Sequence, residues 1–164
     1  MEQALRIRPI SHGDLSDLTS LYRHLYPRYQ IFATALARDA FQQALEESGI
    51  TILAGFQGRT LVSACTLILI PNATWAGKPA ALIENVVTHS DHRRKGHARR
   101  VVNCAIRLAW RVDSIKVLVL GGFNEPGMLG LCASTGFERI SYGFELRRRD
   151  VEPVQVKSRQ ALRA

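Results

Sequence analysis

Residues 80–112, AALIENVVTHSDHRRKGHARRVVNCAIRLAWRV, are the stretch that decides the fold. Residues 80–88 are largely apolar, and such a run predicts a central strand buried on both faces. From Ala98 to Val112 the apolar residues recur at helical spacing, while three arginines share the opposite face. The segment between them holds histidines, cations and one glycine. The stretch therefore predicts a strand, a charged turn and an amphipathic helix.

The remaining elements follow from hydrophobic periodicity and turn residues on both sides of this stretch. On the N-terminal side we expect a strand over residues 4–9, a helix that follows cap residues 11–14 and ends near Tyr26, a helix over residues 34–47, and an antiparallel hairpin over residues 51–56 and 60–70. On the C-terminal side we expect a short strand, a short helix and one or two closing strands, over residues 115–120, 126–134 and 137–148. The resulting order, βααβββαβαβ, predicts an α+β domain with a mixed sheet.

Length and composition are those of one ordinary globular domain. The chain has 164 residues, of which 46% are hydrophobic and 22% charged, so a single buried core is expected. No repeat or Pro/Gly/Ser-rich linker divides it. We expect one domain over residues 1–150, followed by a basic C-terminal tail over residues 151–164.

Hydropathy and cysteine content indicate a cytoplasmic protein. The N-terminus lacks the apolar stretch of a signal peptide, and the longest apolar run, residues 61–70, is too short to span a bilayer. We therefore expect a cytoplasmic location and no membrane partner. Cys65, Cys104 and Cys132 are odd in number and form no Cys-x-x-Cys pair, so we expect reduced thiols and neither a disulfide framework nor a zinc site.

The charge of the chain points to an anionic partner. A formal net charge of +8 and a pI near 10.0 suit a nucleic acid, an acidic membrane surface or a polyphosphorylated cofactor. Part of the excess lies in Arg147, Arg148, Arg149 and the tail, where a solvated chain end is the simpler interpretation. Charge alone does not choose among these partners.

The turn around Gly96 has the properties of an anion-binding site. At a helix N-terminus the first N–H groups point outward and the helix dipole favours negative charge, while a glycine lets a phosphate approach the main chain. Five cations surround this turn and can neutralise phosphates: Arg93, Arg94, Lys95, Arg99 and Arg100. A glycine that merely permits the turn, within a solvated basic loop, explains the same residues, and an isolated glycine motif leaves both interpretations open.

The pattern Arg93-x-x-Gly96-x-Ala98 resembles the Arg/Gln-x-x-Gly-x-Gly/Ala acyl-CoA loop of the GNAT superfamily of N-acetyltransferases. Residues 83–89 resemble the fourth strand of that family, and residues 131–137 resemble its Phe-Tyr-x-x-x-Gly-Phe stretch. The resemblance extends over roughly residues 3–150. It implies a mixed, mostly antiparallel central sheet flanked by helices.

The resemblance also implies acetyl-CoA, or coenzyme A, as a co-substrate and no metal. Amides from Arg94 to Arg99 would bind the pyrophosphate, and the edge of residues 86–88 would pair with the extended, amide-rich pantetheine arm. The cofactor-binding residues implied are Val86, Val87, Thr88, Arg93, Arg94, Lys95, Gly96, His97, Ala98, Arg99 and Asn124.

Two residues are candidates for acid–base chemistry. Glu84, on a central strand beside the cofactor, is the candidate base for the amine, and a buried carboxylate paired with an arginine is the alternative. Cys132 stands where the family commonly has a tyrosine assigned as the acid for the thiolate. A thiol with a pKa of about 8.5 can still donate a proton, and the simpler interpretation is a small core residue.

The expected reaction is acetyl transfer to a primary amine by direct attack in a ternary complex. Tyr22, Tyr26 and Tyr29 lie where the family often builds its acceptor pocket, so the acceptor is expected to be an amine-bearing small molecule. A homodimer would be in keeping with similar proteins. A coenzyme A-binding module without competent chemistry and, less favoured, a nucleic-acid binder are the alternatives. His89 and His92 are expected to be solvated loop residues, because no set of metal ligands follows them.

Overall fold

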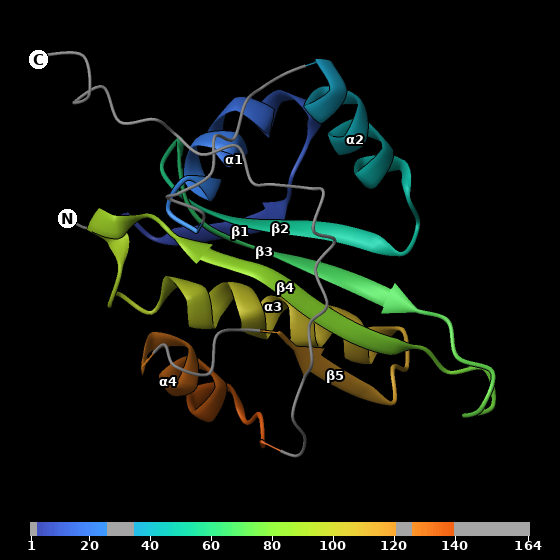
Figure 1. Ribbon diagram of the computed structural model, residues 1–164. Helices are drawn as coiled ribbons and strands as arrows, with labels where there is room; N and C mark the ends of the chain where they lie inside the picture. The colour runs from blue at the N-terminus through green and yellow to red at the C-terminus, as the bar shows by residue number, and fades with distance from the viewer. Residues whose placement is uncertain (1–2, 26–34, 121–125, 140–164) are drawn as a thin grey trace, which may run out of the picture.

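A five-stranded sheet forms the centre of the protein (Figure 1). The computed structural model describes residues 3–25, 35–120 and 126–139. The strands lie in chain order, β1-β2-β3-β4-β5, and only the β4–β5 pair is parallel. Their bounds are β1 Leu5–Pro9, β2 Ile50–Gln57, β3 Thr60–Ile70, β4 Ala80–Thr88 and β5 Lys116–Val119.

Helices cover both faces of the sheet. One face carries α1 and α2, and the other carries α3 and α4 (Figure 1). Their bounds are α1 Leu15–Tyr22, α2 Ala35–Glu46, α3 His97–Arg111 and α4 Pro126–Thr135, with short 3-10 turns at η1 His12–Asp14 and η2 Ser90–His92. The predicted α+β fold and element order are confirmed, and the closing strands expected up to residue 148 lie mostly outside the described residues. No helix in the described part of the chain has both the length and the apolar character needed to cross a bilayer.

The core consists of two apolar layers, one on each face of the sheet. On the α3 side, Val101, Val102 and Ala105 pack against sheet residues such as Leu53 and Ile83, and all are almost fully buried. Full burial of a Val, Leu or Ile side chain contributes about 1.5–3 kcal/mol. On the other face, helix α1 packs against Phe56, Leu61 and Val87 of the sheet through two buried leucines, Leu18 and Leu21. Helix α3, which the sequence predicts as an amphipathic helix, therefore packs against the face of the sheet that includes Ile83 of β4.

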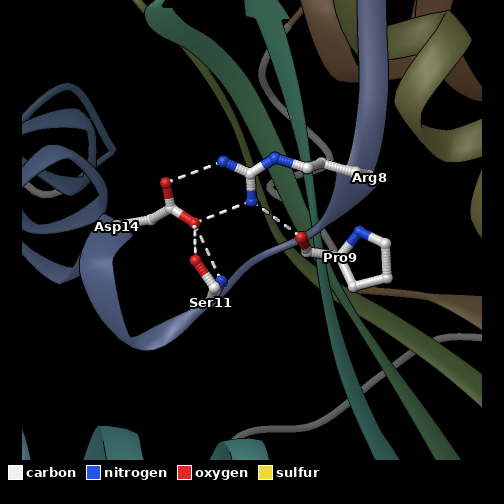
Figure 2. A network of polar contacts seen from close by, with 4 residues as sticks. All are labelled: Arg8, Pro9, Ser11 and Asp14. Atoms are coloured by element: carbon white, nitrogen blue, oxygen red, sulfur yellow. Dashed lines mark hydrogen bonds and ion pairs between the residues drawn. The ribbon is translucent and has the colours of Figure 1, made fainter.

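An ion pair fixes the start of α1 against the end of β1 (Figure 2). Arg8 donates from Nη1 and Nη2 to Asp14 Oδ2 and Oδ1 at 2.7 and 2.9 Å. Ser11 adds hydrogen bonds from its N and Oγ to Oδ2, at 2.8 and 2.7 Å. The Arg8 hydrogen bond, followed by those from Ser11, holds the pKa of Asp14 well below its ordinary value, although burial opposes the shift. The Arg8 guanidinium also lies 4.2 Å from the centroid of the Phe56 ring.

Candidate functional site

Strands β4 and β5 separate at Ile83. Their pairing begins at Ala80 opposite Lys116 and ends at Ile83 opposite Val119, where Leu120 N donates to Ile83 O at 3.1 Å. The five residues that follow in β4 have no partner on β5 in the described part of the chain. The outer edge of β4 therefore becomes accessible beyond this point.

A bulge in β4 lies directly beyond the separation point. On the opposite side, Ala64 of β3 pairs with Val87 and Thr66 pairs with Glu84, so one β3 residue faces two residues of β4. Asn85 takes up the extra length with a φ of 52°, a left-handed conformation that asparagine adopts more readily than most residues. Because a bulge bends its strand and increases the local twist, it directs the second half of β4 away from β5.

The free edge of β4 presents the peptide groups of Val86 and Thr88. Ser63 Oγ donates to Val87 O at 2.8 Å and lies 2.9 Å from Thr88 Oγ1, and Ser63 is 0% exposed. Val87 thus turns its peptide groups toward β3. Because alternate residues of a strand direct their N–H and C=O groups to opposite edges, those of Val86 and Thr88 point away from β3.

The turn before α3 has the backbone of an anion-binding site. Arg94 has a φ of 63°, and Gly96, the N-cap of α3, has a φ of 77°. Left-handed residues in a turn line up backbone N–H groups in a concave row that favours anions. Nothing lies within 4 Å of the position that a Cβ on Gly96 would occupy, so its main chain is open to a ligand. No acidic residue stands in the first turn of α3 to compete for this site.

The edge of β4 and the turn of α3 open onto one groove of about 1310 Å³. This volume exceeds the range of about 300–1,000 Å³ usual for small-molecule pockets and suits a long ligand. Four segments line the groove: the residues directly after α1, the end of β4, the turn and first residues of α3, and α4. The lining residues are Arg23, His24, Leu25, Val86, Val87, Thr88, His92, Arg93, Arg94, Lys95, Gly96, His97, Ala98, Arg99, Gly127, Met128, Gly130, Leu131 and Ser134.

The first arginine of the motif also ties two elements together. Arg93 Nε donates to Thr88 O at 3.2 Å, and Arg93 Nη2 donates to His24 O at 3.3 Å. The side chain therefore joins the end of β4 to the residues that follow α1. Arg94, Lys95 and Arg99 line the groove from exposed positions around the turn.

Four histidines form a chain of rings beside the groove. The ring centroids are 4.1 Å apart for His24 and His89, 5.5 Å for His89 and His92, and 6.2 Å for His92 and His97. His92 Nδ1 lies 2.7 Å from Gln57 Oε1. His89 and His92 are thus half-buried, and the expectation of fully solvated loop residues was wrong. Burial, with His89 and Arg93, lowers the pKa of His24. Within the described ranges, no group of three or more metal-binding side chains could hold a metal ion.

Both candidate acid–base residues, Glu84 and Cys132, are half-buried, and neither is among the residues that line the groove. Glu84 is half-buried and is the first β4 residue beyond the last pair with β5; Asn85 Nδ2 donates to its Oε1 at 3.3 Å. Cys132 is half-buried on α4, and burial raises the pKa of its thiol. The α4 residues on the groove are Gly127, Met128, Gly130, Leu131 and Ser134, and Cys132 is not among them.

Comparison with known proteins agrees with this architecture. Residues 16–137, which include β4, the turn and α3, match the sequence profile of the Acetyltransferase (GNAT) family. The chain belongs to the GNAT acetyltransferase family. The family expected from the residues around Gly96 is thus confirmed.

Solved structures with the same GNAT fold cover most of the chain. A provisionally assigned acetyltransferase from Agrobacterium tumefaciens str. C58 is 35% identical, with a TM-score of 0.83 over 87% of this chain and 99% of that chain. Glucosamine-6-phosphate N-acetyltransferase from Arabidopsis thaliana is 15% identical, with a TM-score of 0.78 over 88% and 99%. Aminoglycoside N-acetyltransferase AAC(6')-Iy, solved in complex with CoA, is 12% identical, with a TM-score of 0.76 over 91% and 97%. No curated protein sequence matches the chain.

Some residues expected in this GNAT site lie outside the described ranges, namely Tyr26, Tyr29 and Asn124. Tyr22 is described, and it packs half-buried against the apolar layer beneath α1. Sequence reasoning missed Ser63, whose hydroxyl bonds to the edge of β4, and the lining of the groove by Gly127, Met128 and Gly130 of α4. A small polar residue within the apolar run of β3 was the available signal for Ser63.

Proposed function

We propose that the chain transfers an acetyl group from acetyl-CoA to the primary amine of a small molecule, by direct attack in a ternary complex. The observation that carries this proposal is the separation of β4 from β5 at a bulge, directly beside an anion-binding turn. A long ligand with amides at one end and phosphates at the other matches both features. The structural neighbour AAC(6')-Iy, which was solved with CoA, supports the same use of this fold.

Coenzyme A would lie along the groove from the turn to the bulge. The backbone at Arg94–Arg99 would receive the pyrophosphate, where the helix dipole and the cations Arg94, Lys95 and Arg99 oppose its charge. The peptide groups of Val86 and the N–H of Thr88, on the edge of β4 that faces away from β3, would pair with the amides of the pantetheine arm as one strand pairs with another. This arrangement would bring the thioester to the bulge.

Acetyl transfer needs a base, an oxyanion donor and a proton for the departing sulfur. The amine nitrogen attacks the thioester carbon, a C–N bond forms and the C–S bond breaks. Glu84, at the separation point, would accept the proton that the nitrogen loses, directly or through water. An N–H on the free edge of β4 would donate to the developing oxyanion. The thiolate would take its proton from solvent or from Cys132.

A coenzyme A-binding module without catalysis is the second candidate. The observation that favours it is the absence of Cys132 from the residues that line the groove, since this position carries the tyrosine assigned as the acid in the family. A thiolate is a stable leaving group, so its protonation is less demanding than that of an alkoxide. The absence of Cys132 from the groove would therefore slow the reaction and would not by itself prevent it.

The test is the release of free coenzyme A from acetyl-CoA, measured with a thiol reagent across a panel of amines. The panel contains amino sugars, aminoglycosides, polyamines, amino acids and peptide N-termini. Release that depends on one class of amine supports the proposal and identifies the acceptor. Coenzyme A binding without release for any amine would favour the binding module. Absence of both binding and release would contradict both candidates.

A further inference from the structure

The two tryptophans of the chain are both exposed at the end of the sheet opposite the groove. Trp75, in the loop between β3 and β4, is 61% exposed, and Trp110, in the last turn of α3, is 51% exposed. Ile70 and Val112, which border these segments, are 41% and 45% exposed. We call these four residues the tryptophan end. Large apolar side chains grouped in this way mark interaction surfaces more often than isolated ones.

Hydrogen bonds and one ion pair hold the two tryptophan segments together. Lys78 N donates to Trp75 O at 3.0 Å, and Asp113 N donates to Trp110 O at 3.1 Å. The side chains of Lys78 and Asp113 also form an ion pair, with Lys78 Nζ 2.7 Å from Asp113 Oδ2. Ile115 N also donates to the carbonyl of Pro79, next to Lys78, at 2.9 Å. The β3–β4 loop and the end of α3 therefore form one surface.

The loop that carries Trp75 has a defined internal structure. Asn72 Oδ1 accepts hydrogen bonds from Thr74 N at 2.9 Å and Thr74 Oγ1 at 2.6 Å. The tight turn after Trp75 places Ala76 and Gly77 at φ values of 53° and 77°. A loop organised by its own contacts presents its exposed side chain at little further entropic cost on binding.

Positive charge lies on the α3 and β5 side of the tryptophan end. Arg107, Arg111 and Lys116 are exposed on α3 and at the start of β5, and α3 contains no Asp or Glu. The acidic residue between these elements, Asp113, is paired with Lys78. The surface therefore combines exposed apolar groups with a net positive rim, and it fits an anionic partner.

We propose that the tryptophan end docks on an anionic lipid surface. Tryptophan favours the headgroup region of a bilayer, and arginine or lysine beside it is attracted to anionic lipids. The β3–β4 loop projects beyond the sheet (Figure 1), a shape that suits a flat surface, whereas a bound peptide needs a groove or a free strand edge. This contact is peripheral and needs no apolar segment long enough to insert, but it differs from the expectation of no membrane partner that hydropathy suggested.

Other partners fit this surface less well. A second copy of the chain would bring Arg107 and Arg111 against cations of its own kind. A single-stranded nucleic acid gains from stacking on tryptophan, but it gains nothing from the aliphatic Ile70 and Val112. The lipid interface alone accommodates the aromatic, aliphatic and basic groups together.

The groove remains accessible when this end is docked. The groove begins at the Thr88 end of β4, and the tryptophan end lies at the Ala80 end of the same strand. Strand β4 has nine residues, and the eight rises between its two ends, at about 3.3 Å each, place those ends about 26 Å apart. Lipid docking and coenzyme A binding are therefore expected to be independent.

Intrinsic fluorescence tests the proposal directly, because Trp75 and Trp110 are the only tryptophans in the sequence. Vesicles of phosphatidylcholine mixed with phosphatidylglycerol should shift the emission of the full chain to shorter wavelength and sediment with the protein. Vesicles of pure phosphatidylcholine should do neither, and high salt should reverse the effect through screening. The single-tryptophan variants Trp75→Phe and Trp110→Phe show whether both residues enter the lipid interface.

Variants of the basic rim distinguish this contact from nonspecific attraction. Arg107→Gln and Arg111→Gln should each weaken partition into the mixed vesicles about fivefold. Arg59→Gln removes the same charge from an exposed position on the β2–β3 turn at the other end of β3, and it should leave partition unchanged. Coenzyme A binding should be the same in all three variants.

Several results would overturn the proposal. An unchanged emission in the presence of anionic vesicles would do so, as would equal weakening by Arg59→Gln. A concentration-dependent dimer that loses the exposure of both tryptophans would assign the surface to a second copy. Binding to single-stranded RNA that shifts the emission while anionic vesicles do not would assign it to nucleic acid.

Discussion

Three residues in left-handed conformations shape the groove: Asn85, Arg94 and Gly96. Asn85 lets β4 bulge away from β5, while Arg94 and Gly96 curve the turn that faces the groove. A left-handed non-glycine residue costs on the order of 1 kcal/mol or more, and such strain gathers at functional sites. Glu84, the side chain proposed as the base, directly precedes Asn85 on β4.

At Glu84 we expect a specific loss of catalysis. Glu84→Gln keeps the size and hydrogen bonding of the side chain but cannot accept a proton, so turnover should fall by about 10²–10⁴-fold. The dissociation constant for coenzyme A, measured by calorimetry, should not change. Glu47→Gln, at an exposed position after α2, is the matched control. Normal turnover in Glu84→Gln would remove this carboxylate from the mechanism.

Variants of Cys132 distinguish an active acetyltransferase from a coenzyme A-binding module without catalysis. Because its thiol is half-buried and does not line the groove, we expect Cys132→Ala to retain acetyl transfer. Cys132→Tyr, which restores the residue common in the family, tests whether an acid at this position accelerates thiol release. An inactive Cys132→Ala variant that still binds coenzyme A would instead show that the thiol takes part in the reaction.

The Asp14 carboxylate stabilises the fold above its ordinary pKa. Its pKa is lowered in the folded state, so its contribution is complete above about pH 3.9 and is lost as the pH falls toward the folded value. Asp14→Asn should reduce the free energy of unfolding at neutral pH by about 1–3 kcal/mol, measured with urea. The difference should shrink in acid. Asp17→Asn, exposed on α1, should have no effect; an equal loss there would contradict this account.

At the scale of elements, the site depends on how β3 holds β4 while β4 leaves β5. The ladder of β3 and β4 continues past the bulge to Ser63 and Thr88, whereas the β4–β5 ladder ends at Ile83. The hydroxyl of Ser63 stabilises this arrangement from within the core. The open edge of β4 is thus supported from its other side.

Ser63→Ala should loosen that support. The variant removes hydrogen bonds to Val87 O and Thr88 Oγ1, and the lost bonds should lower the free energy of unfolding by about 1 kcal/mol. Coenzyme A binding should weaken as well, because the edge that pairs with the pantetheine arm is less ordered. Ser16→Ala, exposed on α1, is the control. Unchanged coenzyme A affinity in Ser63→Ala would show that this contact does not matter for the groove.

Long periodic elements could be predicted from sequence to within a residue or two. The helix predicted over 98–112 is α3, His97–Arg111, and the strand predicted over 80–88 has those same bounds. The helix expected after cap residues 11–14 begins at Leu15, as expected, but it ends at Tyr22 and not near Tyr26. Periodicity reports the buried stripe and not the hydrogen-bond pattern at helix ends.

The site was predictable where it depends on local sequence. The glycine turn and its cations follow from consecutive residues, and Arg93, Arg94, Lys95 and Arg99 line the groove. Arg100, expected among these cations, instead donates from Nη2 to Leu5 O at 3.1 Å. The bulge at Asn85, the carbonyl contacts of Arg93 and the ring chain of His24, His89, His92 and His97 depend on segments far apart in sequence. No single-chain pattern indicates which remote residues a side chain will reach.

At the scale of the whole molecule, the two ends of β4 serve different purposes. The Thr88 end opens onto the groove with its cations, and the Ala80 end lies beside the tryptophan end with its basic rim. Positive charge therefore gathers at two surfaces of the described part of the chain, each of which can attract an anion. The family assignment concerns the first of these surfaces.

The central claim is that coenzyme A binds at the turn around Gly96, and the dissociation constant for coenzyme A in Gly96→Glu tests it most directly. Gly77→Glu is the matched control, because Gly77 has the same φ of 77°, open space around it and a position at the opposite end of the molecule. The account predicts that Gly96→Glu abolishes binding through steric and charge repulsion, while Gly77→Glu leaves it intact. Equal affinity in wild type and Gly96→Glu would contradict the account.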